Sequence, residues 1–393
     1  MRRTDYLDRI DRNQGAIVFY AGCLALAAKL LLSASAYGTN DVTSWAEFMR
    51  YVRDVDSVSI YRAIPLYNHP PLVSGYLWIL GALIGDESPL FPFLLRLPSI
   101  LADCGSIWFT WKLSQVYFAD RRALWVTLTF ALSPTLILVS GFHGNSDPVF
   151  LFFILFSLYM LLVQRNLFVA GLLFGLSVNI KVVPLILLPA FFFLTGRTAN
   201  RMRFFGAAAL MVIAGYGYHL SQDFESLVGN IFFYRGLPQV WGLGRYLEFY
   251  RDFGTLVMES AIIALTALLG WRAGHMAEGF QRDRKLLEAF SITFLATLAL
   301  APGFGVQYLA WLVPAFSFVG PVAAIAYSLS SGMLLLIVYR NWSGGFPLYF
   351  ADSLSRGWGS FVQNLINAEW IFISAVFVWF TMRVLRPPAE REL

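Results

Sequence analysis

The feature that most constrains this chain is the recurrence of long apolar runs from residue 16 to residue 384. Of its 393 residues, 58% are hydrophobic and 13% are charged, whereas a soluble domain carries about 25% charged residues. The shortage of charge is spread along the whole length, and no polar segment is large enough to form a separate soluble domain. The sequence therefore predicts a single integral membrane domain over residues 1–393.

The lengths of the apolar runs predict an all-α polytopic membrane protein, because about 20 apolar residues cross the hydrocarbon core as a helix. The stretch 167–195 is broken by Asn179, Lys181 and Pro184, and we interpret it as two helices that meet near Lys181. With the shorter run 306–319, the total is about 12 transmembrane or re-entrant helices. The other candidate spans are 16–34, 91–116, 123–141, 149–163, 204–219, 254–271, 286–300, 321–339 and 366–384.

Basic residues set the expected orientation, since lysine and arginine concentrate in cytoplasmic loops. The apolar segment 71–85 is short, and we treat it as an interfacial or re-entrant helix within a long outer loop, 35–90, that carries amphipathic helices. Of the 29 lysines and arginines, 17 then fall on the inner side and 9 on the outer side, over roughly twice the length, which predicts that both termini are cytoplasmic. The outer face receives loop 35–90, the turns 142–148 and 301–305, the tip near Lys181 and the loops 220–253 and 340–365.

The net charge of +5 does not indicate a nucleic-acid partner, because the basic residues lie in short clusters between apolar runs and form no stripe with interleaved aromatics. The four histidines are far apart and show no zinc spacing. The expected partner on these grounds is membrane lipid.

Asp41 follows the first apolar run, in the sequence Asn40-Asp41-Val42-Thr43-Ser44-Trp45. A carboxylate at the membrane face beside an indole is suited to act as a general base. The alternative is that Asp41 is the N-cap of an amphipathic helix over 42–53. One residue can also fill both roles.

Asn68 and His69 precede two prolines in the same loop. Proline fixes its own φ and disfavours helix at the preceding residue, so His69 is expected on a rigid turn where it can hydrogen-bond a sugar or a phosphate. The alternative is a plain entry turn for the helix 71–85.

The turn 142–148 places His143, Asn145, Ser146 and Asp147 between two apolar spans. These side chains offer the donors and acceptors that a hydroxyl-rich ligand needs. The alternative is that Ser146 or Asp147 caps the helix 149–163.

Lys181 is an ionisable residue at membrane depth, which costs about 2.5–3.5 kcal/mol at a helix centre and marks a functional hypothesis. A cation there is suited to a lipid-linked phosphate, and Arg235 and Arg245 are further candidates for the same role. The alternative for each is a side chain that extends to the headgroups.

Two further pairs of polar groups lie in or next to apolar runs. Arg96 and Asp103 are seven residues apart on one span, where structural pairing with neighbours is favoured over catalysis. Gln307 and Tyr308 begin a helix on the outer side and are placed to reach a pyrophosphate or a sugar, with packing at the interface as the alternative.

Together these segments resemble the GT-C superfamily of membrane glycosyltransferases, which use polyprenyl- or dolichyl-phosphate sugars. The resemblance covers about residues 37–314 and is strongest to bacterial polyprenyl-phosphate-mannose-type enzymes. The segments that carry it, in chain order, are Asp41-Val42-Thr43-Ser44-Trp45, Tyr67-Asn68-His69-Pro70-Pro71-Leu72, Arg96 to Asp103, Ser133-Pro134 with His143 to Asp147, Asn179-Ile180-Lys181 with Pro184, and Gln307-Tyr308-Leu309-Ala310-Trp311. Val42 and His69 depart from the family pattern, which leaves the sugar and the acceptor open.

The resemblance implies transfer of a hexose, mannose or glucose, from a polyprenyl-phosphate donor to a hydroxyl on a glycan, lipid or protein acceptor, with inversion. Asp41 would take the acceptor proton, and Lys181 or Arg245 would stabilise the leaving phosphate. It also implies a bacterial inner membrane with the site facing outside. No cofactor and no divalent metal are expected. The competing functions are a lipid-linked sugar flippase or small-molecule transporter, and a non-catalytic membrane subunit.

Overall fold

The computed structural model of the protein describes residues 3–85, 87–234, 237–238, 240–276 and 280–386. Helices dominate the fold, and the strands are two-residue pairs. The first half contains α1 (Arg3–Ser35), β1 (Gly38–Thr39), α2 (Asn40–Asp54), α3 (Ile60–Ala63), α4 (Pro71–Ile84), α5 (Phe91–Tyr117), α6 (Asp120–Ala131), α7 (Pro134–Leu138), η1 (Val139–His143), α8 (Asp147–Leu162), α9 (Leu167–Ile180), η2 (Val183–Leu187) and α10 (Leu188–Leu194). The second half contains α11 (Thr198–Gln222), α12 (Phe224–Phe232), β2 (Leu237–Pro238), α13 (Gly242–Tyr246), α14 (Glu248–Met276), α15 (Phe280–Ala299), β3 (Gly303–Phe304), η3 (Val306–Tyr308), α16 (Leu309–Val319), α17 (Pro321–Ser343), β4 (Phe350–Ala351), α18 (Ser353–Arg356) and α19 (Ser360–Leu385).

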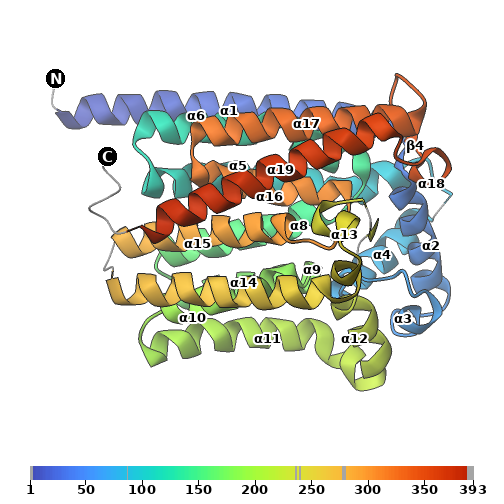
Figure 1. Ribbon diagram of the computed structural model, residues 1–393. Helices are drawn as coiled ribbons and strands as arrows, with labels where there is room; N and C mark the ends of the chain where they lie inside the picture. The colour runs from blue at the N-terminus through green and yellow to red at the C-terminus, as the bar shows by residue number, and fades with distance from the viewer. Residues whose placement is uncertain (1–2, 86, 235–236, 239, 277–279, 387–393) are drawn as a thin grey trace.

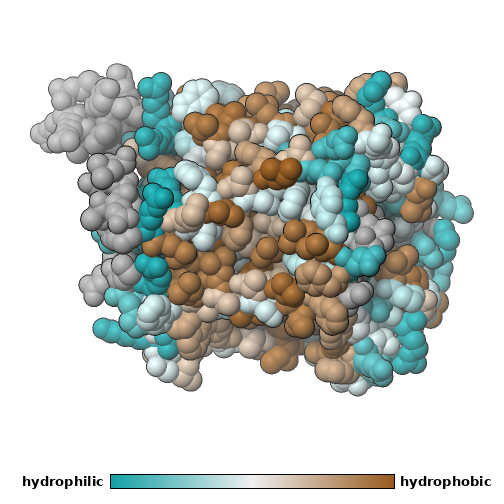
Figure 2. All heavy atoms as spheres, viewed as in Figure 1, coloured by the Kyte–Doolittle hydropathy of each residue, from teal (hydrophilic) through white to brown (hydrophobic). Residues whose placement is uncertain are grey.

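The long helices run roughly side by side in one bundle (Figure 1). The first described turn of α1 and the last turn of α19 lie at one end, which we call the terminal end. The helices α2, α3 and α4 gather with β4 and α18 at the other end, which we call the polar end. In the face shown in Figure 2, hydrophobic residues dominate the middle of the bundle, and hydrophilic residues collect at its two ends. This distribution is the one that a bilayer requires.

Six helices among the described residues are long and apolar enough to cross a membrane: Asn13–Ser35, Asp120–His143, Thr198–Gln222, Phe253–His275, Pro321–Ser343 and Ser360–Leu385. Five shorter apolar helices accompany them, at Pro71–Ile84, Asp147–Leu162, Leu167–Ile180, Val183–Leu194 and Val306–Val319. The all-α polytopic class is thus confirmed, whereas the expected number of about 12 spans is not. A helix of 14 residues such as α4 is about 21 Å long, which is shorter than the hydrocarbon core of about 30 Å.

Two helical breaks position polar residues at the polar end. The stretch 167–195 is two helices that meet at Lys181, as the sequence predicts, because α9 ends at Ile180 and a 3-10 turn containing Pro184 follows. The expected span 123–141 lies within the candidate span Asp120–His143, with a local break where α6 ends at Ala131 and α7 begins at Pro134. Proline has no amide hydrogen and its ring clashes with the preceding turn, which explains this second break.

The outer loop 35–90 is tied to the bundle by contacts that are distant in sequence. The strand β1 pairs in parallel with β4. The side-chain nitrogen Nδ2 of Asn230 on α12 donates to the backbone carbonyl of Tyr61 at 2.6 Å. The buried Arg96 donates to the carbonyls of Ser33 and Ala36, at 3.1 and 3.0 Å, and so holds the end of α1. Asp103 pairs with Lys29 at 2.8 Å. Arg96 and Asp103 therefore have structural partners, as their sequence context favoured.

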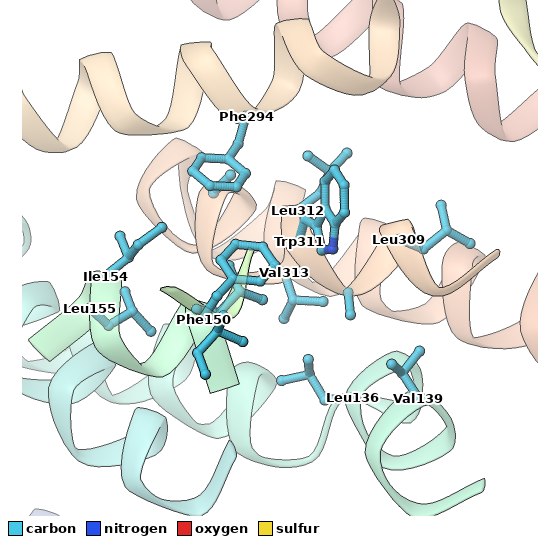
Figure 3. Packing of buried hydrophobic residues seen from close by; sticks show 14 of the residues in the cluster. Leu136, Val139, Phe150, Ile154, Leu155, Phe294, Leu309, Trp311, Leu312 and Val313 are labelled. Carbon is cyan, nitrogen blue, oxygen red and sulfur yellow. The ribbon is translucent and has the colours of Figure 1, made fainter. Parts of the chain in front are cut away.

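The core beneath the polar end is packed with apolar side chains (Figure 3). Phe150 on α8 and Trp311 on α16 are both buried, with ring centroids 5.8 Å apart in an edge-to-face arrangement. Leu136 and Val139 approach from the neighbouring α7–η1 segment. Close packing of this kind fixes side-chain rotamers, so the polar groups carried on α8 and α16 stand on a rigid base.

Candidate active site

Asp41 lies in the first turn of α2, and it is not the cap of that helix. The N-cap is Thr39, whose hydroxyl accepts a hydrogen bond from the amide of Asp41 at 3.3 Å. The same hydroxyl donates to the carbonyl of His143 at 2.8 Å. The expectation that Asp41 caps an amphipathic helix is therefore wrong, because Thr39 already satisfies the orphan donor. The carboxylate of Asp41 is left for another partner.

That partner is His143, at the end of the π-helical turn η1. Turns of this kind re-aim a side chain within a helix and occur often at functional sites. Gly144 follows with a φ of 84°, and a Cβ there would lie 2.6 Å from the side chain of Val42. Glycine at 144 thus permits both the backbone conformation and the close approach of η1 to α2.

Asp41, His143 and Tyr339 form a hydrogen-bonded chain. The Nε2 atom of His143 lies 2.9 Å from Oδ2 of Asp41, and its Nδ1 atom lies 2.9 Å from the hydroxyl of Tyr339. A carboxylate can only accept, so Nε2 of His143 carries the proton that it donates to Asp41. The side chain of His143 is 3% exposed and that of Asp41 is 36% exposed. The histidine is therefore fixed, and part of the Asp41 carboxylate remains exposed. We call the cluster of Asp41, His143, His69 and Lys181 the polar pocket.

The surroundings of Asp41 keep its carboxylate ionised. Burial opposes the negative charge, but the interaction and hydrogen bond with His143, followed by smaller contributions from His69 and Lys181, hold the pKa of Asp41 below its ordinary value of 3.8. At neutral pH the group is thus a carboxylate, which is the form that accepts a proton.

His69 lies near Asp41 and Lys181, in the turn before α4. Its ring lies over Trp45 of α2, with centroids 4.2 Å apart, and its carbonyl accepts from the hydroxyl of Tyr61 at 2.8 Å. Burial, together with the positive charge of Lys181, lowers the pKa of His69 to about 3. The ring is therefore neutral at physiological pH and offers one donor and one acceptor. The helix-entry turn that the sequence predicts is also present, because Pro70 precedes α4 and Pro71 begins it.

Asp147 and Lys181 form a buried ion pair that the sequence did not predict. Nζ of Lys181 contacts Oδ1 of Asp147, and the indole of Trp311 donates to Oδ2 of Asp147 at 2.8 Å. The side chain of Asp147 is fully buried, and that of Lys181 is 19% exposed. Neither Ser146 nor Asp147 makes a side-chain cap to α8, so the capping alternative fails. The ammonium of Lys181 also lies 5.3 Å from the ring of Tyr308.

Asn145 orders the turn between these two groups. Its side-chain oxygen accepts from the amide of Asp147 at 2.8 Å, and its carbonyl accepts from the hydroxyl of Ser99 on α5. The hydroxyl of the neighbouring Ser146 is buried and has no protein partner among the described residues. The turn 142–148 is therefore pre-organised around the site, and Ser146 retains an unused polar group.

Sequence reasoning missed two tyrosines. Tyr339 lies on α17, 196 positions from the histidine it contacts, and no local pattern marks it. Tyr234 follows α12 and lies near Tyr308 and Asn68. Burial, reinforced by the negative charge of Asp41, raises the pKa of Tyr234, so the phenol remains protonated. Tyr234 thus lies close to Asn68 and Tyr308, which the sequence predicted separately.

Of the remaining predicted residues, Gln307 and Arg245 lie in the described part of the chain. Gln307 lies in the 3-10 turn η3 beside Tyr308. Arg245 lies on α13, with its guanidinium 5.9 Å from the ring of Tyr246, and its role in binding stays a prediction. Arg235 lies outside the described residues. The described part of the chain contains no group of three or more histidine, cysteine or acidic side chains placed to hold a metal ion.

An apolar groove opens beside the polar pocket. Its volume is about 500 Å³, and it lies between α4 and α5, with Leu72 and Pro98 among its lining residues. Trp45, which contacts His69, and Asn145 and Ser146 of the turn 142–148 also line it. A polar cluster and an apolar groove thus lie close together, which suits an amphipathic substrate.

Part of the chain matches a known protein family. Residues 68–218 match the family described as dolichyl-phosphate-mannose-protein mannosyltransferase. No curated protein matches the chain. The family match confirms the resemblance of the chain to GT-C superfamily glycosyltransferases and indicates glycosyltransferase activity of a mannosyltransferase-like kind. The matched segment contains His69, His143, Asp147 and Lys181, whereas Asp41 precedes it.

Proposed function

We propose that this protein transfers a hexose, mannose or glucose, from a polyprenyl-phosphate donor to an acceptor hydroxyl at the polar end, which faces outside, with inversion at the anomeric carbon. The observation that carries the proposal is the carboxylate of Asp41, ionised and held by His143, within the electrostatic reach of Lys181. A base and a cation around one pocket are what a displacement at a glycosyl phosphate needs.

In the proposed step, the oxygen of the acceptor hydroxyl forms a bond to the anomeric carbon while its proton passes to Asp41. The bond between the anomeric carbon and the phosphate oxygen breaks, and polyprenyl phosphate departs with the electron pair. Among the described side chains, His143 is the hydrogen-bond partner of the Asp41 carboxylate, through Oδ2. The other oxygen, Oδ1, is therefore the one assigned to the acceptor.

Charge around the pocket limits how the donor phosphate binds. Asp41 is paired with His143, and the ammonium of Lys181 is already paired with Asp147. A phosphate thus needs a further cation, and we assign this role to Arg245, with Arg235 from the same loop as the other candidate. Lys181 then serves the leaving phosphate while Asp147 and Trp311 hold its position.

The apolar groove between α4 and α5 is proposed to hold the isoprenoid chain of the donor. Leu72, Trp78 and Ile79 line it and are each more than a third exposed, so the groove is open toward the expected hydrocarbon region. An isoprenoid chain gains about 25 cal/mol for each Å² of apolar surface that it buries. Neutral donors such as His69 and Asn68 remain for the sugar hydroxyls.

The alternative function is a lipid-linked sugar flippase, and one assay separates the two. The purified protein would be placed in liposomes with a radiolabelled polyprenyl-phosphate hexose in the outer leaflet and a mixed set of glycan and lipid acceptors. Our proposal predicts that label leaves the lipid and appears on an acceptor. Intact labelled donor recovered from the inner leaflet, with none cleaved, would instead establish a flippase.

A further inference from the structure

A second cavity lies at the terminal end of the bundle, far from Asp41. Its volume is about 840 Å³, and it forms where α5 ends, α6 and α15 begin, and α14 and α19 end. These helix ends all lie opposite α2 and β4 (Figure 1). The cavity is therefore separate from the candidate active site, and its role is independent of the proposed function.

The cavity is strongly basic. Five arginines and one lysine line it, against the single carboxylate of Glu288. The carboxylate of Glu288 forms a salt bridge with Nζ of Lys285 at 2.5 Å and accepts a hydrogen bond from the hydroxyl of Tyr117 at 3.2 Å. The arginines thus bring a large excess of positive charge to one recess. They are Arg122, Arg272, Arg284, Arg383 and Arg386.

Aromatic and backbone groups hold several of these arginines along the wall. The guanidinium of Arg284 lies 4.9 Å from the ring of Tyr117, and that of Arg383 lies 5.6 Å from the ring of Trp379. Arg272 donates to the carbonyl of Leu385 at 3.0 Å. The aromatic contacts involve the face of the guanidinium, and the hydrogen bond of Arg272 uses one N–H group. A guanidinium has five N–H donors. Donors therefore remain for an anion.

The rest of the lining is apolar and reaches the surface of the bundle. Val319, Ala323 and Phe380 line the interior, and Val322 and Trp379 are exposed at the rim. A small soluble anion gains nothing from an apolar surface, whereas acyl chains are stabilised when they bury it. In a membrane protein, a basic recess between helix ends with apolar walls has the chemistry of a binding site for an acidic lipid headgroup.

We infer that this cavity binds an acidic phospholipid. Arg122, Arg284 and Arg383 hold its phosphate, and its acyl chains pass over Val322 and Trp379 at the rim. Because the helix ends that line the cavity come from both halves of the chain, the bound lipid links α5 and α6 to α14, α15 and α19. The lipid is thus expected to stabilise the assembled bundle.

The test compares dioleoyl phosphatidylglycerol with dioleoyl phosphatidylcholine, which have the same chains and differ in headgroup charge. Binding to the purified full-length chain would be measured by native mass spectrometry, and the melting temperature would be measured in parallel. The test variant replaces Arg122, Arg284 and Arg383 with Gln. The control variant makes the same change at Arg121, Arg197 and Arg203, which are exposed basic residues outside the cavity lining.

Each arginine near a membrane surface contributes about fivefold to the binding of an acidic lipid, so losing three weakens binding by roughly 100-fold. We expect phosphatidylglycerol to bind and stabilise the wild type and the control, and to bind the cavity variant roughly 100-fold more weakly. Equal binding of the two lipids by the wild type, or an equal loss in both variants, would overturn the inference. Equal occupancy by glycerol 3-phosphate alone would also overturn it, since the ligand would then be a soluble phosphate. If the cavity variant does not fold, a photoactivatable phosphatidylglycerol would be crosslinked to the wild type instead. The inference predicts crosslinks on the helix ends that line the cavity, and crosslinks only at other positions would overturn it.

Discussion

Replacing Asp41 with Asn is expected to lower the rate of sugar transfer by about 10²–10⁴-fold, the usual contribution of a general base. Asparagine has the shape of aspartate, and its side-chain oxygen can still accept from Nε2 of His143, so the contact at 2.9 Å survives. The variant loses the capacity to take a proton. Donor KM should therefore change by less than about threefold, while kcat falls.

The matched control for this prediction is Glu47→Gln. Glu47 lies on the same helix, α2, and its side chain is exposed, so the change removes a carboxylate outside the pocket. We expect wild-type kcat and an unchanged melting temperature for this control. Rapid transfer by Asp41→Asn in a protein that binds its donor normally would remove Asp41 from the role of base.

The second large effect is expected at Lys181. Replacing it with Ala leaves the fully buried carboxylate of Asp147 without its cation, and breaking a buried pair in this way costs about 3–5 kcal/mol of unfolding free energy. Chemical unfolding in detergent would measure that loss. Donor KM should rise as well, and by more than acceptor KM, if the ammonium serves the donor phosphate.

A double variant separates the structural role of Lys181 from its proposed catalytic role. In Lys181→Ala with Asp147→Asn, no unpaired charge is left at this position, so most of the stability should return, while donor binding and transfer stay impaired. Recovery of both stability and transfer would show that Lys181 serves the fold alone. Lys112→Ala is the control for losing a lysine from the bundle. Its ammonium lies 4.9 and 4.4 Å from the rings of Trp108 and Trp111, so a loss of about 0.5–1 kcal/mol is expected.

Much of the fold can be predicted from local sequence properties. Apolar runs and the shortage of charge identify the membrane class, and Asn179, Lys181 and Pro184 mark the meeting point of α9 and the next helical segment, as the structure confirms. Helix number was harder to predict. The runs that form α8, α9 and α16 give helices of 16, 14 and 11 residues, because turns at the polar end shorten them. Hydropathy alone does not reveal how many of these cross a bilayer.

The candidate site was predictable as a set of residues and not as a network. Asp41, His69 and His143 each stand in a conspicuous polar segment, but nothing local says that Asp41 bonds to a histidine 102 positions away. Thr39 takes the capping role that the sequence assigned to Asp41, because its hydroxyl lies within reach of the Asp41 amide. Tyr339 and Tyr234 each precede an arginine in the sequence, but nothing local indicates which residues they contact. Such contacts depend on tertiary packing of distant helices, which residue spacing does not encode.

The most direct test of the central claim is the chemical outcome of a single turnover by the wild-type protein. The donor would be a polyprenyl-phosphate hexose labelled with carbon-13 at the anomeric carbon, and the products would be read by NMR and by lipid extraction. Direct attack by a hydroxyl that Asp41 deprotonates predicts free polyprenyl phosphate and a glycoside in equal amounts, with the anomeric configuration opposite to that of the donor. A glycoside that keeps the donor configuration, or donor recovered uncleaved in the presence of every class of acceptor, would contradict the proposed mechanism.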